Sequence, residues 1–388
     1  VGYGFGVKGF EVQLKTFPKV TVSRITPPEK NLDFSLFWKV WDNLSNSYYD
    51  KSKVVESQMV YGAIKGLTAS LGDPYTVFLT PSENKTTIED LQGNFEGVGI
   101  QIGFKGDKLA VIAPLPKSPA ENVGIKAGDY IVGIKDDKKG INRNTIGISL
   151  PEAVSAIRGA RGTKVTLMLL RDDNNEPFEV EVTRGTIDVP SVVLTFEGDN
   201  KDIAHIKLLK FGGETTGEWA KIIAQIASKS DIKGVILDLR NNPGGYLQGA
   251  VEIASEFLPA GYVAVIEEKG NGQQIPYKTT KSGILINNKV VVLLNQGSAS
   301  ASEILAGALR DNRKIQIIGE KSFGKGTVQE PQDLDGGAGI HVTIAKWLTP
   351  NGTWVNGKGL EPDIKIETKA DDKDDKVLLE ALKQISNF

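Results

Sequence analysis

The chain has 388 residues and a mass of 41.9 kDa, which is enough for two or three domains with separate hydrophobic cores. Its formal net charge of −2, without a long basic cluster, gives no electrostatic argument for nucleic-acid binding. The absence of cysteine excludes disulfides, thiolate zinc sites and cysteine nucleophiles. A His-based metal site or serine triad would need His205 or His341, and no H-E-x-x-H pattern is present. An enzyme that needs a base would therefore depend on lysine or on the carboxylates.

Residues 1–30 are mixed in character and predict an N-terminal segment or linker, because they end in Thr-Pro-Pro-Glu-Lys. Small and apolar residues at 1–7 are typical of the end of a membrane helix and equally of a disordered linker, and they are too few to span a bilayer. Because the first residue is Val1, we expect that the chain was cut from a longer protein. An extracytoplasmic protein with a membrane tether upstream of residue 1 is the corresponding hypothesis.

Residues 31–92 predict a helical cap region. Phe34, Phe37, Trp38 and Trp41 recur at three- and four-residue spacing, and apolar residues continue this pattern to about residue 71. An aromatic stripe of this kind is typical of a core or a packing surface, and we predict one here. The Asp-Pro pair at 73–74 ends the helical unit.

Residues 93–187 predict a compact β-rich module. Strands are expected at 97–100, 108–112, 128–134, 164–171 and 178–184, and capping boxes at 118–121 and 149–152 begin two helices. This order resembles a PDZ domain in the permuted arrangement of bacterial proteases. Such domains add a peptide as a strand beside a helix and hold its carboxylate on the N–H groups of a glycine-containing loop. The residues that match this peptide-binding loop by position are Gly97, Val98, Gly99 and Ile100.

Arg158 lies at the end of the second helix of this module, in the sequence Ile-Arg-Gly-Ala-Arg-Gly. Its guanidinium could bind a peptide carboxylate or a neighbouring domain. It could equally be a solvated arginine whose charge favours the helix dipole. The sequence leaves these alternatives open.

Residues 188–368 change to an α/β pattern. Strands are expected at 202–211, 234–239, 262–266, 290–294 and 315–318, with helices at 219–227, at 249–257 and after residue 300. This alternation predicts a mostly parallel sheet whose loops at the strand ends carry function. Residues 369–388 predict an acidic linker and an amphipathic C-terminal helix, which would pack on the body or on a second copy in a homo-oligomer.

Ser300 lies in the sequence Gly-Ser-Ala-Ser-Ala-Ser-Glu at 297–303, between a predicted strand and a predicted helix. A serine at such a turn has the free N–H groups of the helix beside it, where they can meet a developing negative charge. The same residues form an S-x-x-E capping box with Glu303, and most such serines only cap a helix. The turn by itself favours the cap.

Lys325 follows in the sequence Gly-Lys-Gly-Thr-Val-Gln at 324–329. Residues 319–325 fit the phosphate-loop pattern G-x-x-x-x-G-K, but Gly326 replaces the Ser or Thr that would bind magnesium, and a strand follows where a helix is needed. A neutral, buried lysine can instead act as general base for a serine. The flanking glycines would let its backbone pack closely. Gln329 lies four positions on, so that in one strand both side chains would share a face.

Gly244 and Gly245 belong to an Asn-Asn-Pro-Gly-Gly sequence at 241–245 that follows a predicted strand. Their N–H groups, with that of Ala301, could form an oxyanion hole worth several kcal/mol of the barrier. An ordinary Pro-Gly-Gly turn is the alternative, and by itself the pattern favours the turn.

Together these motifs resemble the carboxyl-terminal processing, or tail-specific, serine peptidase family with a PDZ domain, over about residues 33–368. By this resemblance Ser300 is the nucleophile, Lys325 the base and Gln329 the residue that orients the lysine. Asp311 also matches a family position, and we assign it a structural role. The resemblance implies a multi-domain α/β fold with a helical cap, a permuted PDZ domain and a ClpP/crotonase-like α/β catalytic core.

The function implied is a serine endopeptidase with a Ser–Lys dyad, without metal or cofactor, that cleaves the exposed C-terminal tails of protein substrates. The resemblance also favours an extracytoplasmic, membrane-anchored enzyme. One alternative is a module that binds lipophilic ligands on the same fold, as in interphotoreceptor retinoid-binding protein. Another is a crotonase-type acyl-CoA enzyme, for which the PDZ-like insertion has no purpose.

Overall fold

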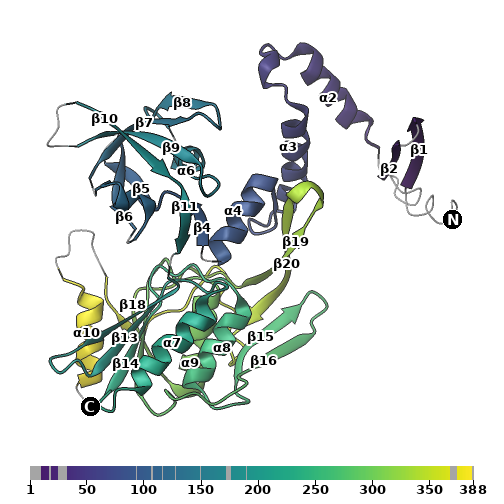
Figure 1. Cartoon of the computed structure of the whole chain (residues 1–388). Coiled ribbons are helices and arrows are strands. Elements are labelled where there is room, and N and C mark those ends of the chain that lie inside the picture. The colour runs from purple at the N-terminus through teal and green to yellow at the C-terminus, as the bar shows by residue number, and fades with distance from the viewer. Residues whose placement is uncertain are drawn as a thin grey trace. The chain divides into compact units, whose positions relative to one another are not determined.

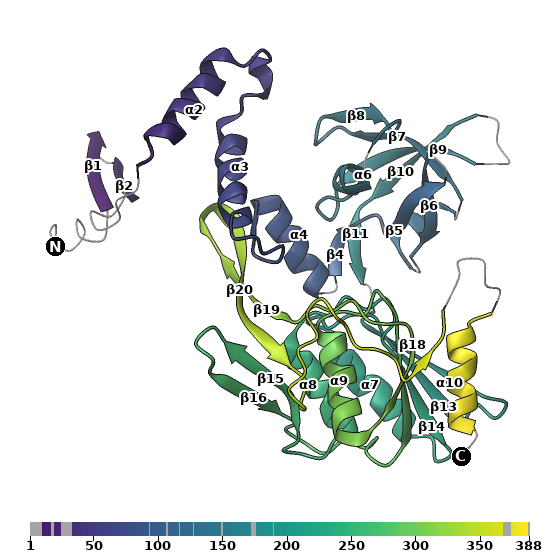
Figure 2. The ribbon, with the colours of Figure 1, turned by 180° about the vertical axis from the view of Figure 1, so that it is seen from behind.

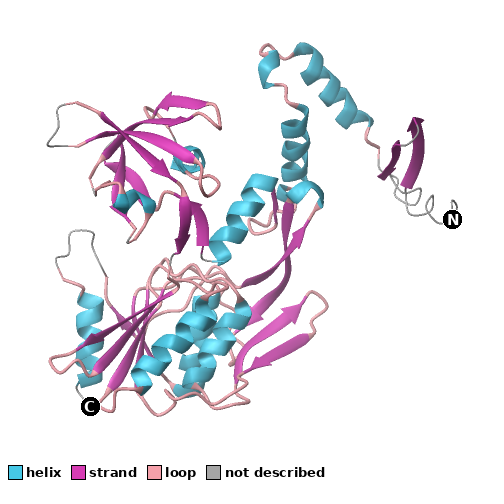
Figure 3. Ribbon diagram, viewed as in Figure 1, coloured by secondary structure: helices cyan, strands magenta, loops and turns pink. Residues whose placement is uncertain are grey.

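The structure of the protein is a computed structural model that describes residues 10–16, 19–24, 33–92, 94–105, 108–115, 117–126, 128–148, 150–171, 176–188, 190–367 and 374–386. The chain divides into two compact units, Val1–Leu71 and Gly72–Phe388. Figures 1 and 3 show the helices and strands of both units. None of the helices in the described ranges is long and apolar enough to cross a membrane.

The first unit contains a hairpin and two α-helices. The hairpin pairs β1 (Phe10–Thr16) with β2 (Lys19–Arg24) where we expected only a linker; residues 1–7 and 26–30 lie outside the described ranges. The helical prediction is confirmed as α2 (Ser35–Ser47) and α3 (Glu56–Ala69), separated by the short helix η1 (Lys51–Lys53). Asp50 ends the continuous pattern, because its side chain accepts from the Ser52 N–H at 3.1 Å and caps η1.

The aromatic stripe on α2 is not buried by the part of the chain that the structure describes. Phe37 stacks edge-on against Trp38, with ring centroids 5.1 Å apart, and tilts against Trp41. Trp38 nevertheless keeps 56% of its surface exposed, and no residue of this fully described helix is buried. Of the two predicted alternatives, a core or a packing surface, the described residues show no core on α2, and the exposed stripe agrees with a packing surface.

The second unit begins with β3 (Val77–Leu79) and α4 (Pro81–Gln92), followed by the β-rich module. The module's main sheet has the order β10-β9-β7-β6-β5, with β8 on β7, and a separate pair joins β4 to β11. Its strands are β4 (Asn94–Gly97), β5 (Ile100–Lys105), β6 (Lys108–Pro114), β7 (Tyr130–Asp136), β8 (Ile141–Asn144), β9 (Lys164–Leu170), β10 (Phe178–Thr183) and β11 (Gly185–Asp188). Its helices are α5 (Pro119–Asn122) and α6 (Leu150–Ile157).

The capping prediction for α5 is confirmed, since the Ser118 side chain accepts from the Glu121 N–H at 3.2 Å. The predicted cap at Ser149 lies outside the described residues. β5 ends the main sheet on one side, and α6 packs near it. This arrangement leaves one strand edge free for the addition of a peptide strand.

The α/β core contains the predicted, mostly parallel sheet, in the order β12-β13-β14-β17-β18-β21, with β12 alone antiparallel to its neighbour. Its strands are β12 (Val192–Glu197), β13 (Ile203–Leu208), β14 (Gly234–Asp238), β17 (Lys289–Leu294), β18 (Gln316–Gly319) and β21 (Ile364–Lys365). A second sheet joins β15 (Val263–Lys269), β16 (Gln274–Lys278), β19 (Thr327–Asp333), β20 (Gly339–Leu348) and β3. A second short helix, η2 (Asp335–Gly337), lies in the connection from β19 to β20.

Helices cover both faces of the parallel sheet (Figures 1 and 2). α7 (Thr215–Ala227), α8 (Leu247–Phe257) and α9 (Ala301–Arg313) share one hydrophobic cluster with the first face. α10 (Lys376–Ser386) packs on the other face, where Val377, Ala381 and Ile385 are buried against β14, β17 and β18. Of the two placements considered for the C-terminal helix, the structure has the one on the body.

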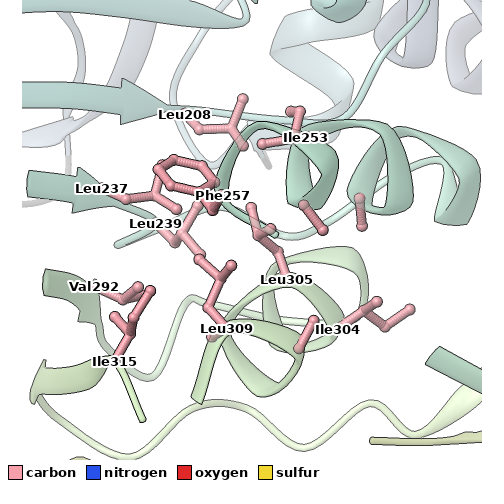
Figure 4. Packing of buried hydrophobic residues seen from close by; sticks show 14 of the residues in the cluster. Leu208, Leu237, Leu239, Ile253, Phe257, Val292, Ile304, Leu305, Leu309 and Ile315 are labelled. Carbon is pink, nitrogen blue, oxygen red and sulfur yellow. The ribbon is translucent and has the colours of Figure 1, made fainter. Parts of the chain in front are cut away.

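Buried hydrophobic side chains from α8, α9 and the sheet ends pack together in the main core, as Figure 4 shows for Phe257, Leu305 and Leu309. Leu309 is fully buried and lies one helical turn after Leu305, so that α9 presents a continuous apolar stripe. This packing anchors the helix that begins at Ser300.

We expect Leu309→Ala to lower the free energy of unfolding by about 2–5 kcal/mol, because it removes buried methyl groups and leaves a cavity. Chemical denaturation followed by circular dichroism measures the change. Leu379→Ala is the matched control in α10, where the leucine is 55% exposed, and it should change stability by less than about 0.5 kcal/mol. Equal effects of the two substitutions would contradict the assignment of the core.

Candidate active site

Ser300 lies between β17 and α9 with a backbone φ of 53°. With its ψ of −114°, this positive-φ conformation is uncommon for a residue with a side chain and is found at functional sites. The flanking serines have structural roles: the Ser298 hydroxyl donates to the Leu239 carbonyl at 2.9 Å and the Ser302 hydroxyl to the Asn242 carbonyl at 3.0 Å. Both are fully buried, whereas Ser300 is half-buried. Among the three serines, Ser300 is the one placed for chemistry.

Glu303 joins the serine turn to the lysine loop. Its carboxylate is fully buried and accepts the N–H groups of Ser300 at 2.8 Å and Lys325 at 2.9 Å on one oxygen. The other oxygen accepts the Gly324 N–H at 2.7 Å and the Ser322 hydroxyl at 2.5 Å. The predicted tie between Glu303 and the helix start is confirmed, and the same carboxylate also holds the backbone of Lys325.

The two glycines beside Lys325 allow the close packing that we expected. A Cβ on Gly324, whose φ is +89°, would lie 2.7 Å from the Gly359 nitrogen. A Cβ on Gly326 would lie 2.7 Å from the Trp354 ring nitrogen. The loop therefore fits only without side chains at these positions. The strand that follows, β19, confirms that no phosphate-loop helix begins here.

The side chain of Lys325 is half-buried, and burial lowers the pKa of its amine, while the carboxylate of Asp73 acts in the opposite direction. Its Nζ lies 4.8 Å from the centroid of the Tyr75 ring. Within the described ranges, this nitrogen makes no hydrogen bond or ion pair, and so none with the Ser300 hydroxyl. Glu303 thus holds the backbones of Ser300 and Lys325 close together, but their side chains are not hydrogen-bonded to each other.

Gln329 faces the same cavity as Lys325, but not for the reason that we expected. β19 begins at Thr327, after the lysine, and a register shift falls between Val328 and Gln329. Lys325 and Gln329 therefore do not lie in one strand, and the prediction that they share a strand face is wrong. The Gln329 amide donates to the hydroxyls of Thr327 at 2.8 Å and Thr343 at 3.1 Å. Both donors are occupied, which leaves the carbonyl oxygen to accept a bond from the lysine amine.

Of the two glycine N–H groups at 241–245 that we expected as oxyanion donors, one is available in the described residues. The Gly244 N–H is already bonded to the Asn242 side chain at 2.9 Å, so this residue is not an oxyanion donor. Its contribution is close approach, since a Cβ there would lie 2.8 Å from the Ser300 Cβ. In the part of the chain that the structure describes, the N–H groups of Gly245 and Ala301 have no partner. These two N–H groups remain the available donors.

A cavity of about 460 Å³ brings these groups together. Ser300, Lys325, Gln329, Gly244 and Gly245 all line it. Its other walls are mostly apolar and aromatic, with a few charged side chains, and include Phe211, Leu247, Ile304, Trp347, Lys210, Asp90 and Leu91. A concave site with few convergent polar groups is typical of substrate binding.

Sequence reasoning missed three contributors to this site. α4 supplies the cavity residues Asp90 and Leu91, although the sequence indicated only the end of a helical unit before it. Tyr75, which directly follows the Asp-Pro pair at 73–74, contacts the lysine amine. Asn242 was included only as part of a turn. The Asp-Pro pair at 73–74 marked the turn that carries Tyr75, but no local signal pointed to the lysine.

Asp311 lies outside the cavity lining, and its carboxylate accepts the Asn351 N–H at 2.9 Å. It thus holds the end of α9 to the loop after β20. This contact agrees with a structural role.

The residues expected to bind a peptide line a smaller pocket of about 150 Å³ between β5 and α6. Val98, Gly99 and Ile100 form one wall, and Arg158 lies at the other. Gly97 lies beside it, where a Cβ would be 3.4 Å from the Phe95 ring. A Cβ on Gly99, whose φ is +75°, would collide with Ser118 at 2.3 Å.

Arg158 is not a solvated helix-end arginine. Its guanidinium pairs with Asp90 of α4 at 3.1 Å and lies over the Phe95 ring at 4.5 Å from the centroid. Of the alternatives left open by the sequence, the structure has the contact with a neighbouring element. Because Asp90 also lines the main cavity, this pair connects the two pockets.

Comparison with known proteins places this site in a family. A model of peptidase family S41 matches residues 202–366, and a PDZ-domain model matches residues 86–170. The carboxy-terminal processing protease CtpA of Bacillus subtilis (strain 168) is 36% identical over 329 residues, which cover 85% of this chain and 68% of that protein. The chain belongs to the carboxy-terminal processing proteases of peptidase family S41. The CtpB protease of the same strain is 34% identical, with 85% of this chain and 67% of that protein covered.

Solved structures agree with this membership. The photosystem II D1 C-terminal processing protease superposes with a TM-score of 0.52 at 28% identity, over 90% of this chain and 96% of that chain. A putative S41 protease from Bacteroides fragilis NCTC 9343 has a TM-score of 0.57 at 15% identity, over 93% of this chain and 99% of that chain, and shares the fold. As a carboxy-terminal processing protease, the chain is a serine-type peptidase with a PDZ domain. This membership decides against the ligand-binding and crotonase-type alternatives.

We expect Glu303→Gln to lower kcat by roughly 100-fold, because an amide cannot accept all four donors and the two loops would shift against each other. Peptide cleavage under saturating substrate measures kcat. Glu361→Gln, at a side chain that is 66% exposed, is the control and should retain turnover. Wild-type kcat in Glu303→Gln would contradict the joining role of this carboxylate.

Proposed function

We propose that this protein is a serine endopeptidase that uses Ser300 and Lys325 as a dyad and cleaves C-terminal regions of other proteins. The observation that carries the proposal is the convergence of a strained serine turn, a half-buried lysine and the Gly245 loop on one cavity. Among the described residues, the N–H groups of Gly245 and of Ala301, which follows the serine, have no hydrogen-bond partner. Family membership supports the reaction class.

In the first step the neutral amine of Lys325 takes the Ser300 hydroxyl proton as Oγ forms a bond to the peptide carbonyl carbon. The oxyanion that forms accepts from the N–H groups of Gly245 and Ala301, which are available donors. The lysine then gives its proton to the leaving nitrogen as the C–N bond breaks. Water hydrolyses the acyl-enzyme, again with the lysine as base. The Gln329 carbonyl orients the amine.

The PDZ domain would present the substrate. A peptide added as a strand along the free edge of β5 would place its carboxylate at the loop of residues 97–100, with Arg158 at the end of the same groove. The contact between Arg158 and Asp90 provides a link from this groove to the cavity that holds Ser300. We extend the proposal to an extracytoplasmic, membrane-anchored enzyme, which fractionation of cells that express the full-length protein would test.

We expect Ser300→Ala and Lys325→Ala each to lower kcat/KM for a short peptide by at least about 1,000-fold while the far-UV circular dichroism stays unchanged. Each removes a group on which the acyl transfer depends. Ser228→Ala and Lys321→Ala, at exposed positions, are the matched controls. Covalent labelling by a fluorophosphonate should require Ser300. Near-normal turnover in either site variant would rule out the dyad.

We expect excision of residues 95–186 to reduce cleavage of long substrates with free C-termini more than cleavage of short peptides, because only long substrates gain from tethering. The excision joins Asn94 to Ile187, and these residues lie in the paired strands β4 and β11, so that a short glycine linker closes the gap. The ratio of kcat/KM values for the two substrate classes is the readout. An unchanged ratio would remove the tethering role.

A further inference from the structure

The Tyr75 ring lies against the amine of the proposed base. Lys325 Nζ is 4.8 Å from the ring centroid, which is within the range of a cation–π interaction. Tyr75 comes from a segment 250 positions earlier in the chain and does not line the main cavity. It therefore contacts the lysine from outside the lining of that cavity.

Hydrogen bonds hold the turn that carries this ring. The Asp73 carboxylate accepts the Tyr75 N–H at 3.0 Å and the Thr76 hydroxyl at 2.7 Å, which closes a turn at residues 73–76. The Thr76 hydroxyl accepts the Thr343 N–H at 3.1 Å, and β3 then pairs with β20, with Val77 opposite His341. The Thr343 hydroxyl accepts from Gln329. The turn is thus bonded to the same strand that positions the glutamine.

The charged groups around Lys325 come from three elements. Asp73 in this turn favours the charged amine, whereas burial lowers its pKa. His341 on β20 has a pKa lowered by burial and by the charge of Lys325. Glu303 of α9 is bonded to the lysine N–H. A ring face attracts an ammonium group but gives little to a neutral amine, so the contact with Tyr75 stabilises only the protonated lysine.

We propose that the turn at residues 73–76 positions the base: in the resting enzyme the Tyr75 ring holds the ammonium form of Lys325 off Ser300. The amine leaves the ring when it loses its proton and then bonds to the serine hydroxyl. This inference rests on the proposed function, because it assigns Lys325 as the base. Tyr75 is a positioning residue, since it acts through the lysine and does not touch the reacting peptide.

The first experiment compares the pH profile of kcat/KM for a short peptide in Tyr75→Leu and Tyr75→Phe. Loss of the ring should move the acidic limb to lower pH and raise kcat/KM on that limb about three- to tenfold relative to the alkaline plateau of the same variant. Tyr75→Phe keeps the ring and should keep the limb at the wild-type pH. Tyr262→Leu, at a tyrosine that is 43% exposed, is the control. A lower plateau with an unmoved limb would indicate a purely structural role and overturn the proposal.

A second experiment needs no turnover. In a Ser300→Ala background, competitive acetylation of Lys325 over a pH series, read by mass spectrometry of its peptide, gives the pKa of the amine. The pKa of the Lys325 amine should fall in Tyr75→Leu and should be unchanged in Tyr75→Phe. Pentafluorophenylalanine at position 75 keeps the shape and reverses the ring's charge distribution, so it should act like leucine even if Tyr75→Leu folds poorly. Equal titration in all variants overturns the proposal, whereas normal turnover in Lys325→Ala would overturn the proposed function and leave this measurement valid.

Discussion

The active site depends on one buried carboxylate. Glu303 has no cation beside it in the described residues, and four neutral donors from the serine turn and the lysine loop satisfy it. Its place in the first turn of α9 also favours a negative charge. Because an unsatisfied buried charge is costly, neither segment can move away without a penalty. The backbones of Ser300 and Lys325 are therefore held together before any substrate binds.

A second group of contacts joins the 241–245 loop to the same turn. Asn242 is fully buried, donates to the Leu208 carbonyl at 2.7 Å and accepts the Gly244 N–H. Its carbonyl accepts the Ala299 N–H at 3.0 Å and the Ser302 hydroxyl. One asparagine thus connects the end of β13, the loop and the serine turn. Because the Asn242 side chain accepts the Gly244 N–H, the Gly245 N–H is the glycine donor that remains available in the described residues.

The C-terminal helix α10 is also bonded to the strand that leads into the 241–245 loop. Asp238 ends β14, and although burial opposes its charge, hydrogen bonds from Arg240 and His205 hold the pKa of its carboxyl at about 2. Arg240 also pairs with Asp375 at 2.7 Å, and the Asp375 side chain accepts the Leu378 N–H in the first turn of α10. The strand end that leads into the 241–245 loop is therefore bonded to a helix more than 130 residues away.

Sequence patterns alone were enough to predict the succession of strands and helices in the PDZ module, the alternation of strands and helices in the core and the turn at Ser300, because these depend on local periodicity, caps and glycines. The glycines beside Lys325 likewise predicted that its backbone packs closely against another segment. Four features needed the folded structure: Gln329 follows a bulge, the Gly244 N–H donates to Asn242, α2 buries none of its aromatic stripe and the Tyr75 ring contacts the Lys325 amine. These outcomes depend on competition for hydrogen bonds and on packing between distant segments, which no local pattern encodes.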